Sequence, residues 1–329
     1  MRDDVAVQLR APRYVLGEYE EDHAAIPNLA ERIAEFRILP KPSFWGWGNV
    51  RRTEKGVAAM AVETGTATLR AAGLDPAAVD ALVLCSTRLP ADTRDHGRFV
   101  QTIMTGIGLD NADFTGVTLG RCVNLLAALQ VAEAMVAGGR HRRVLVITAD
   151  RAEENDRVEK FALFSDGAAS CLVMDARESG ACAGSGSVSG SSSVSDSDAG
   201  DMVFEMAGCA AVHDIHRLDW SNEIDSDLSR EVNERVLKPR GLTAEDVAGL
   251  CHSNIFRPIV TLKEMQAGFV PAQLYTGNIE RIGHCFAADP IINLVDRAAA
   301  EPLLPGGHYL LAASVPGSRI GVLLRALTT

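Results

Sequence analysis

The residue with the clearest chemical potential is Cys122, which stands at the start of an almost wholly apolar stretch. Within 123–137 only Asn124, Gln130 and Glu133 are polar, a pattern typical of a helix that is buried on nearly every side. A thiol in the first turn of such a helix lies at the positive end of the helix dipole, which favours the nucleophilic thiolate. The alternative is a small buried cysteine without chemistry. The residue by itself leaves both interpretations open.

A repeat of about half the chain length relates two parts of the sequence. Residues 73–85 resemble 241–251, and 143–149 resemble 308–314. Between these pairs, Gly120 and Gly283 are each followed two residues later by a cysteine. Such a period is too long for a solenoid and indicates two fused βα modules related by a pseudo-two-fold axis.

Apolar runs that predict strands alternate with longer stretches that predict helices. The expected strands cover 81–87, 143–149, 169–174, 247–252, 308–314 and 320–326. The expected helices cover 54–72, 97–108, 123–137, 227–238, 257–268 and 289–300. This alternation predicts an α/β protein whose sheets are covered on both faces. We expect an N-terminal half over 1–183, a flexible Ser/Gly-rich connector over 184–200 and a C-terminal half over 201–329.

The composition excludes several classes of function. The chain has 329 residues, 47% of them apolar, and a net charge of −11, which opposes binding to nucleic acid. Its seven cysteines show no CxxC spacing, so we expect neither a metal site nor a disulfide framework, and a reducing cytoplasm is the natural location. An apolar run at the start that would indicate a signal peptide is missing, as is a run long enough to span a membrane.

Five segments, taken in order, resemble motifs of the thiolase superfamily, and within it of the β-ketoacyl-acyl-carrier-protein synthase III group. Cys122 before its buried helix resembles the nucleophile of that family. The segments 164–170 (FSDGAAS), 252–257 (HSNIFR), 278–284 (NIERIGH) and 314–321 (SVPGSRIG) resemble FGDGAGA, HQANxR, N-I-x-R-Y-G-N and the glycine-rich C-terminal loop. The resemblance runs from about residue 57 to residue 327 and implies a thiolase-like, five-layered α/β/α/β/α fold with duplicated halves.

The resemblance also implies roles for single residues and partners. It makes Cys122 the nucleophile, His252 a catalytic histidine, and the backbone N–H groups of Cys122 and Gly317 the oxyanion hole, with Asn254 supporting the loop. The expected substrates are a coenzyme A thioester or an acyl-phosphopantetheine carrier protein, with no permanently bound cofactor. The protein would be a homodimer that buries an edge shared by the sheets.

One departure from the family pattern changes the expected chemistry. The catalytic asparagine of the family falls on His284. A neutral imidazole can still donate one hydrogen bond, but it is also a base that can deprotonate a hydroxyl, amine or thiol. Asp289 either orients His284 or caps the helix that begins before Pro290, and the Asp-Pro pair favours the cap.

Gly283-His284 followed by Ala288-Asp289 is similar to a GH…D pattern of a synthase III offshoot in natural-product pathways. Members of that offshoot transfer an acyl group to oxygen, nitrogen or sulfur. We therefore expect a cysteine-dependent acyltransferase with ping-pong kinetics and a small-molecule acceptor. The alternatives are a decarboxylative β-ketoacyl synthase and a non-catalytic partner subunit with the same fold.

Aromatic and basic residues mark a candidate entrance for the donor. Trp45 and Trp47 stand beside Arg51 and Arg52, a combination that could stack an adenine and bind phosphates. Arg257 and the basic run 140–143 could meet an acidic carrier protein. The alternatives are ordinary packing tryptophans and solvated basic turns.

Overall fold

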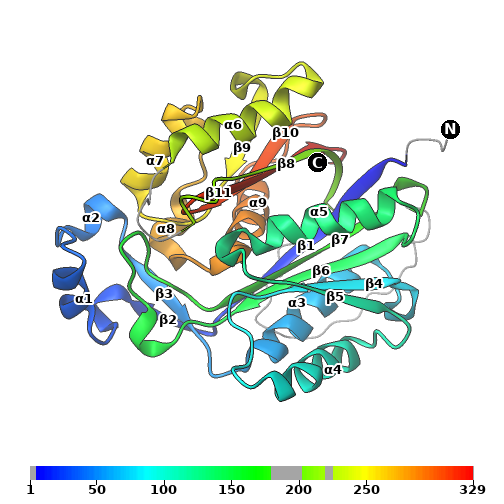
Figure 1. Cartoon of the computed structure of the whole chain (residues 1–329), viewed down its shortest axis with the longest axis horizontal. Coiled ribbons are helices and arrows are strands. Elements are labelled where there is room, and N and C mark those ends of the chain that lie inside the picture. The colour runs from blue at the N-terminus through cyan, green and yellow to red at the C-terminus, as the bar shows by residue number, and fades with distance from the viewer. Residues whose placement is uncertain (1–4, 179–201, 219–224, 329) are drawn as a thin grey trace.

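Strands and helices alternate through both halves of the chain in the computed structural model, which describes residues 5–178, 202–218 and 225–328 (Figure 1). The expected connector over 184–200 lies outside the described residues. The boundaries that we assign to the two halves therefore stay predictions.

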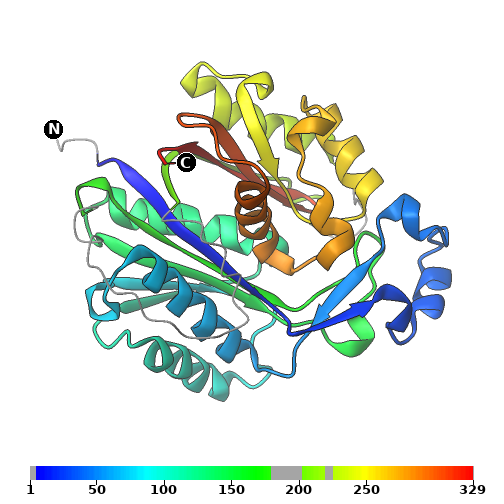
Figure 2. The same ribbon diagram turned by 180° about the vertical axis from the view of Figure 1, so that it is seen from behind.

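The elements of the N-terminal half include every strand and helix expected there from the apolar pattern, and several more. Its strands are β1 (Val7–Leu16), β2 (Tyr19–Asp22), β3 (Asn49–Arg52), β4 (Ala81–Cys85), β5 (Asp113–Val117), β6 (Arg143–Asp150) and β7 (Gly167–Asp175). Its helices are α1 (Leu29–Glu35), α2 (Pro42–Trp45), α3 (Val57–Ala72), α4 (His96–Ile107) and α5 (Asn124–Ala137). The pair β2–β3 forms a separate two-stranded sheet that projects with α1 and α2 from one side of the molecule (Figure 2).

The C-terminal half repeats the arrangement with fewer strands. Its strands are β8 (Val203–His213), β9 (Val247–Cys251), β10 (His308–Val315) and β11 (Ser318–Ala326). Its helices are α6 (Ser226–Leu237), α7 (Arg257–Gln266), α8 (Gly277–Ile282) and α9 (Asp289–Ala300). None of the helices in the described part of the chain is long and apolar enough to cross a membrane.

The order of the strands supports the two-fold relation between the halves. The large sheet runs β5-β4-β6-β7-β1-β8-β11-β10-β9. Strand β4 is parallel to β6, and β7 is antiparallel to both β6 and β1. In the same way β9 is parallel to β10, and β11 is antiparallel to both β10 and β8. The sheet thus consists of a first group of strands, β5-β4-β6-β7-β1, and a second group, β8-β11-β10-β9, which meet where β1 pairs with β8.

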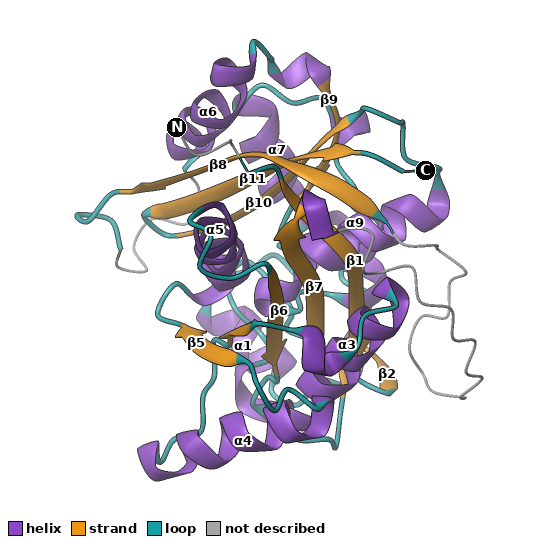
Figure 3. Ribbon diagram, turned by 90° about the vertical axis from the view of Figure 1, so that its right-hand side faces the viewer, coloured by secondary structure: helices purple, strands orange, loops and turns teal. Residues whose placement is uncertain are grey.

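Two helices form the middle layer of the fold. Helix α5 packs against β4, β6 and β7 of one group and against β10 and β11 of the other, while α9 contacts β1, β7, β9 and β10. Helices α3 and α4 cover the outer face of the first group, and α6 and α7 cover that of the second (Figure 3). This is the thiolase-like, five-layered α/β/α/β/α fold implied by the sequence motifs.

The apolar character of α5 follows from its position. Leu125, Leu126 and Leu129 are fully buried in a core that also contains Ile291 and Leu294 of α9. Burial of each such side chain stabilises the fold by about 1.5–3 kcal/mol. The middle layer therefore holds the N-terminal ends of α5 and α9 in fixed relation, and the candidate catalytic residues lie at those ends.

Candidate active site

A strained turn before α5 presents the sulfur of Cys122. The φ angles of Leu119 and Arg121 are 71° and 56°, values that residues other than glycine seldom adopt. The Asn124 side chain stabilises the turn because its Oδ1 accepts a hydrogen bond from the Gly120 N–H at 2.8 Å, while its Nδ2 donates to a carbonyl of the loop after β4. Cys122 is thus buried at the start of α5, as predicted, with 7% of its surface exposed.

His284 is held through its backbone by the segment that contains the FSDGAAS sequence. Its N–H donates to the Leu163 carbonyl at 2.8 Å, and its carbonyl accepts from the Ser165 N–H at 2.9 Å. A Cβ at Gly283, where φ is +66°, would lie 2.7 Å from the Leu163 carbonyl oxygen. The glycine therefore permits the close approach, and two motifs that are far apart in the sequence meet at the site.

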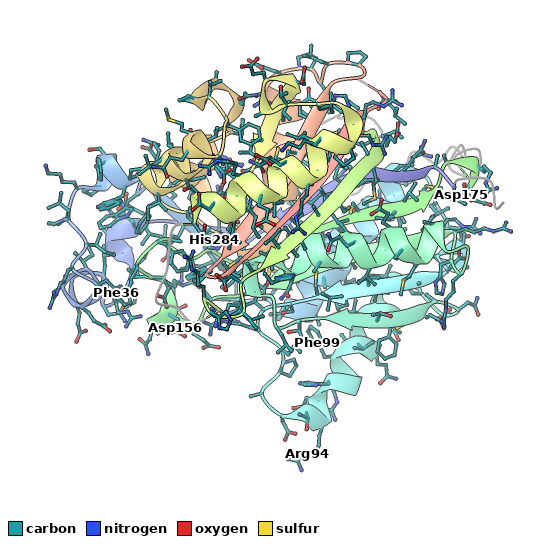
Figure 4. All side chains as sticks on the ribbon, turned by 45° about the horizontal axis from the view of Figure 1, so that its top comes forward. Phe36, Arg94, Phe99, Asp156, Asp175 and His284 are labelled. Carbon is teal, nitrogen blue, oxygen red and sulfur yellow. The ribbon has the colours of Figure 1, made fainter. Side chains whose placement is uncertain are left out.

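Cys122, His284 and Asp289 form a hydrogen-bonded chain. The Cys122 sulfur lies 3.1 Å from His284 Nε2, and His284 Nδ1 is hydrogen-bonded to Asp289 Oδ2. The Asp289 carboxylate also accepts from the backbone N–H groups of Cys285 at 2.8 Å and Asn254 at 2.5 Å. His284 lies between the two halves (Figure 4), and neither it nor Asp289 is exposed.

The cap interpretation of Asp289 is therefore wrong for this helix. The N-cap position of α9 is occupied by Ala288, which makes no side-chain cap bond, and Asp289 is already helical. Its carboxylate points back to the histidine five residues earlier. The left-handed conformation of Phe286, with φ of 53°, turns the chain so that this contact forms.

Burial and the neighbouring charges shift the pKa of His284 in opposite directions. Burial lowers the pKa of this imidazole, but the charges of Asp289 and Cys122 outweigh it and raise the pKa to about 10. The ring of Phe164 lies 5.0 Å from the imidazole and that of Phe286 lies 6.1 Å from it. The charged neighbours of His284 therefore favour its protonated form.

His252 lies at the end of β9 and is held differently. Its Nδ1 is 2.8 Å from the Ser253 carbonyl oxygen, and because a carbonyl only accepts, Nδ1 carries the proton. Burial lowers the pKa of His252, so the ring is neutral and Nε2 is an acceptor, buried without a partner among the described residues. Asn254 supports this loop, since Asn293 donates to both Asn254 Oδ1 and the His252 carbonyl.

The turn between β10 and β11 borders the pocket at Cys122. This pocket is lined by Cys122 and His284 together with Pro316 and Ser318 of the turn. Gly317 has a φ of +68°, and a Cβ there would lie 2.5 Å from the backbone of Arg217. The turn therefore requires a glycine at this position. The oxyanion hole formed by the backbone N–H groups of Cys122 and Gly317 stays a prediction.

The two tryptophans of the candidate donor entrance pack on Phe256. Trp47 is buried, and its ring lies 5.8 Å from that of Phe256. Trp45 is partly exposed, lies 5.4 Å from the same ring and donates from Nε1 to the Leu39 carbonyl. The buried position gives Trp47 a packing role, whereas Trp45 remains accessible for stacking.

Arg51 and Arg52, which we expect to bind phosphate, and Arg257, which we expect to meet a carrier protein, are already paired with carboxylates. Their partners are Glu20 for Arg51, Glu21 and Glu154 for Arg52, and Glu280 for Arg257. A phosphate would have to share these cations with the glutamates. The assignment of Arg51, Arg52 and Arg257 to donor binding therefore stays a prediction.

Three residues that the sequence analysis does not assign to the site also contribute to it. Asn124 supports the nucleophile turn, and Lys263 and Arg319 line the pocket with Cys122. A lysine beside a glutamate in a helix ordinarily indicates a solvated face, so local pattern could not place Lys263 inside. Among the described residues, no group of three or more histidines, cysteines and carboxylates is placed to hold a metal ion.

Comparisons with known proteins find similar sequences. A family model described as 3-oxoacyl-acyl-carrier-protein (ACP) synthase III matches residues 118–191. A β-ketoacyl-acyl-carrier-protein synthase III of Allorhizobium ampelinum is 26% identical over 277 residues, which cover 81% of this chain and 83% of the relative.

Solved structures match over nearly the full length. The structure titled as the acyltransferase ChlB3 has a TM-score of 0.77 at 14% identity, covering 98% of both chains. The 3-oxoacyl-acyl-carrier-protein synthase III of Aquifex aeolicus has a TM-score of 0.73 at 16% identity, covering 97% of this chain and 99% of that one. The chain therefore has a thiolase-like fold, and its sequence is similar to that of β-ketoacyl-acyl-carrier-protein synthase III proteins.

Proposed function

We propose that this protein transfers an acyl group from a thioester donor, through a Cys122 acyl-enzyme, to an oxygen, nitrogen or sulfur acceptor. The observation that carries the proposal is the chain Cys122–His284–Asp289. A nucleophile hydrogen-bonded to a histidine, which is oriented by a carboxylate, is the arrangement that activates a nucleophile in acyl transfer.

Acylation begins with the proton on His284 and the negative charge on the Cys122 sulfur. The thiolate attacks the donor carbonyl carbon, and the backbone N–H groups of Cys122 and Gly317 hold the oxyanion. When the carbon–sulfur bond of the donor breaks, the departing thiolate takes the proton from His284 Nε2. The products are the free donor thiol, a Cys122 thioester and a neutral His284.

Transfer to the acceptor reverses the proton movement. Acylation removes the sulfur charge that helps to raise the pKa of His284, so the imidazole can now act as a base. It takes the proton of the incoming hydroxyl, amine or thiol as that group attacks the acyl carbon. The Cys122 thiolate leaves beside the new imidazolium, which restores the starting state without any net proton uptake.

His252 and Asp289 act on other atoms in this scheme. The unpartnered Nε2 of His252 can accept a hydrogen bond from a second N–H or O–H of the acceptor molecule, other than the proton that His284 takes, and so hold the acceptor for attack. The Asp289 carboxylate keeps the Nδ1 proton of His284 in place. The donor is a coenzyme A thioester or an acyl-carrier protein, no permanently bound cofactor takes part, and a small molecule of secondary metabolism is the acceptor.

Decarboxylative condensation is the second candidate, favoured by the retained His252 and by the names of the curated relatives. It needs two hydrogen-bond donors on the thioester oxygen of the malonyl unit. The contact of His252 Nδ1 with the Ser253 carbonyl leaves Nε2 as an acceptor, which argues against this role. We therefore prefer acyl transfer.

The test is intact-mass analysis after incubation with acyl-coenzyme A and with acyl-carrier protein. We expect one acyl adduct on the wild type and none on Cys122→Ala. His284→Asn, which restores the residue of the family, should lower transfer to an acceptor by about 10²–10⁴-fold. An unmodified wild-type protein with every donor would contradict the proposal in favour of a non-catalytic partner subunit. Release of CO₂ from a malonyl donor with formation of a β-ketoacyl product would instead support condensation.

A further inference from the structure

The pocket at Cys122 has a positively charged wall made by Lys263 and Arg319. Both residues line the same pocket as Cys122 and His284. Lys263 is 5% exposed and Arg319 is 1% exposed. The charge of Lys263 also reaches His252, which places this wall among the candidate catalytic groups.

Lys263 has hydrogen-bonding capacity beyond its protein contacts. Its ammonium lies 3.2 Å from Ser314 Oγ and 3.2 Å from Glu264 Oε1. An ammonium has three N–H donors, and the contacts within the described residues account for two of them. One donor is therefore available to a molecule in the pocket.

Arg319 has a free donor as well. Its Nη1 and Nη2 bind both oxygens of Glu264, at 2.8 and 2.9 Å, and this bidentate pair cancels their charges. The Arg319 Nε–H is buried without a partner among the described residues. A buried donor without a partner carries a desolvation cost that a ligand could remove.

Asp225, the other carboxylate at this wall, has partners elsewhere. It accepts from the backbone N–H groups of Asp227 and Leu228 at the start of α6 and forms an ion pair with Arg217 at 2.7 Å. With Arg319 and Glu264 neutralising each other, Lys263 supplies one buried positive charge to the pocket. Burial lowers the pKa of Lys263, and the nearby carboxylates act against that effect.

We propose that Lys263 and the Nε–H of Arg319 bind a carboxylate at the far end of the acyl group that Cys122 accepts. The inference rests on the proposed function and specifies its donor as the half-thioester of a dicarboxylic acid. Lys263 and Arg319 share the single carboxylate of Glu264, which leaves one positive charge in excess. Buried charges in proteins are paired in most cases, and in the proposed function the group that shares the pocket with Cys122 is the acyl chain. A cation paired with the carboxylate also stabilises it relative to the enolate that forms when CO₂ leaves, which favours transfer over condensation.

The test compares donors that differ in one terminal group. Acylation of Cys122 is timed by intact mass with malonyl- against propionyl-coenzyme A, and with succinyl- against butyryl-coenzyme A. In each pair a carboxylate replaces a methyl group. We expect the wild type to favour the carboxylated donor by about tenfold or more in at least one pair, because charge-assisted hydrogen bonds are worth about 1.5–3 kcal/mol.

Three variants separate recognition from folding. Lys263→Met should abolish the preference and leave the rate with the methyl donor within a few fold, whereas Lys263→Arg should keep most of the preference. Lys238→Met, at an exposed lysine that pairs with Glu234, is the control and should behave as the wild type. The preference is a ratio measured on one sample, so a partly unfolded preparation does not alter it.

Two outcomes are distinguishable. Adducts that form equally fast with both members of each pair, or a preference that survives in Lys263→Met, would overturn the carboxylate site and leave the proposed acyl transfer standing. The lack of any adduct with all four donors and with acyl-carrier protein would overturn both.

Discussion

The contact between His284 and Asp289 shows that the tertiary structure can give a residue a role different from the one that its neighbours in the sequence predict. From sequence, Asp289 before Pro290 has the features of a helix cap, because local rules consider only its neighbours in the chain. The structure instead directs the carboxylate to His284. The motifs indicate Cys122, His252 and His284 as candidates, and the structure places Cys122 and His284 in hydrogen-bonding contact. The partner of His284 depends on a left-handed residue, Phe286, which no local rule indicates.

We predict that Asp289→Asn changes the pH dependence of acylation. The leaving thiolate needs the proton of His284, so acylation should decline as pH rises above the pKa of about 10. Without the Asp289 charge the pKa of His284 falls, and the decline should begin at lower pH. We also expect a loss of activity of about 10²–10⁴-fold, as for other carboxylates that orient a catalytic histidine.

The variant Asp289→Asn also tests how much the ion pair between His284 and Asp289 stabilises the protein. The pKa of His284 is raised in the folded state, so its ion pair stabilises the protein fully below about pH 6.5, and this contribution is lost as pH rises through about 10. The difference in unfolding free energy between wild type and Asp289→Asn should therefore be larger at pH 6 than at pH 10. Asp227→Asn, at an exposed acid in the first turn of α6, is the control. An equal difference in unfolding free energy at both pH values would contradict the ion pair between His284 and Asp289.

At the scale of elements, apolar periodicity located the buried strands and helices, and it missed those that break the pattern. All six expected helices and all six expected strands are present within a few residues. Strand β1 was missed because Arg10, Pro12 and Arg13 interrupt it, and a bulge between the two arginines accommodates the irregularity. Strand β5 was missed because most of it is exposed. Tertiary pairing, which periodicity does not contain, holds both strands.

The turn between β10 and β11 provides a test at this scale. We predict that Gly317→Ala lowers the melting temperature and the rate of Cys122 acylation, because the new Cβ would meet the Arg217 backbone at 2.5 Å and φ is +68°. Gly306→Ala is the matched control, since its φ is +73° but no atom lies within 4 Å. The control should lose about 1–2 kcal/mol of stability from its conformation alone and keep its acylation rate. Equal acylation rates in the two variants would argue against a role for the turn.

For the whole molecule, the exposed edge of the large sheet is a candidate interface between two copies of the chain. Strand β5 ends the sheet, and an uncovered edge strand can pair with another chain. Phe114 on β5 is 59% exposed, and Leu119, which follows it, is 93% exposed. Large exposed apolar side chains beside a free edge are typical of an interaction surface. This supports the homodimer implied by the family resemblance, which stays a prediction.

Sedimentation analysis tests this interface. We expect the wild type to be a dimer at micromolar concentration and the double variant Phe114→Glu/Leu119→Glu to be a monomer, because the carboxylates would be buried without partners. Leu304→Glu, at an apolar residue that is 61% exposed elsewhere, should leave the dimer intact. A monomeric wild type, or a double variant that remains dimeric, would rule out this edge as the interface.

The two-fold relation of the halves places a cysteine near the start of each central helix. Cys122 precedes α5, and Cys285 occupies the corresponding region before α9. Burial and the neighbouring carboxylates raise the pKa of Cys285 well above that of an ordinary thiol, whereas Cys122 lies beside His284. The two corresponding positions therefore differ in their surroundings. The N-terminal half supplies the sulfur of the candidate site and the C-terminal half supplies the imidazole and the carboxylate, so the hydrogen-bonded chain needs residues of both halves.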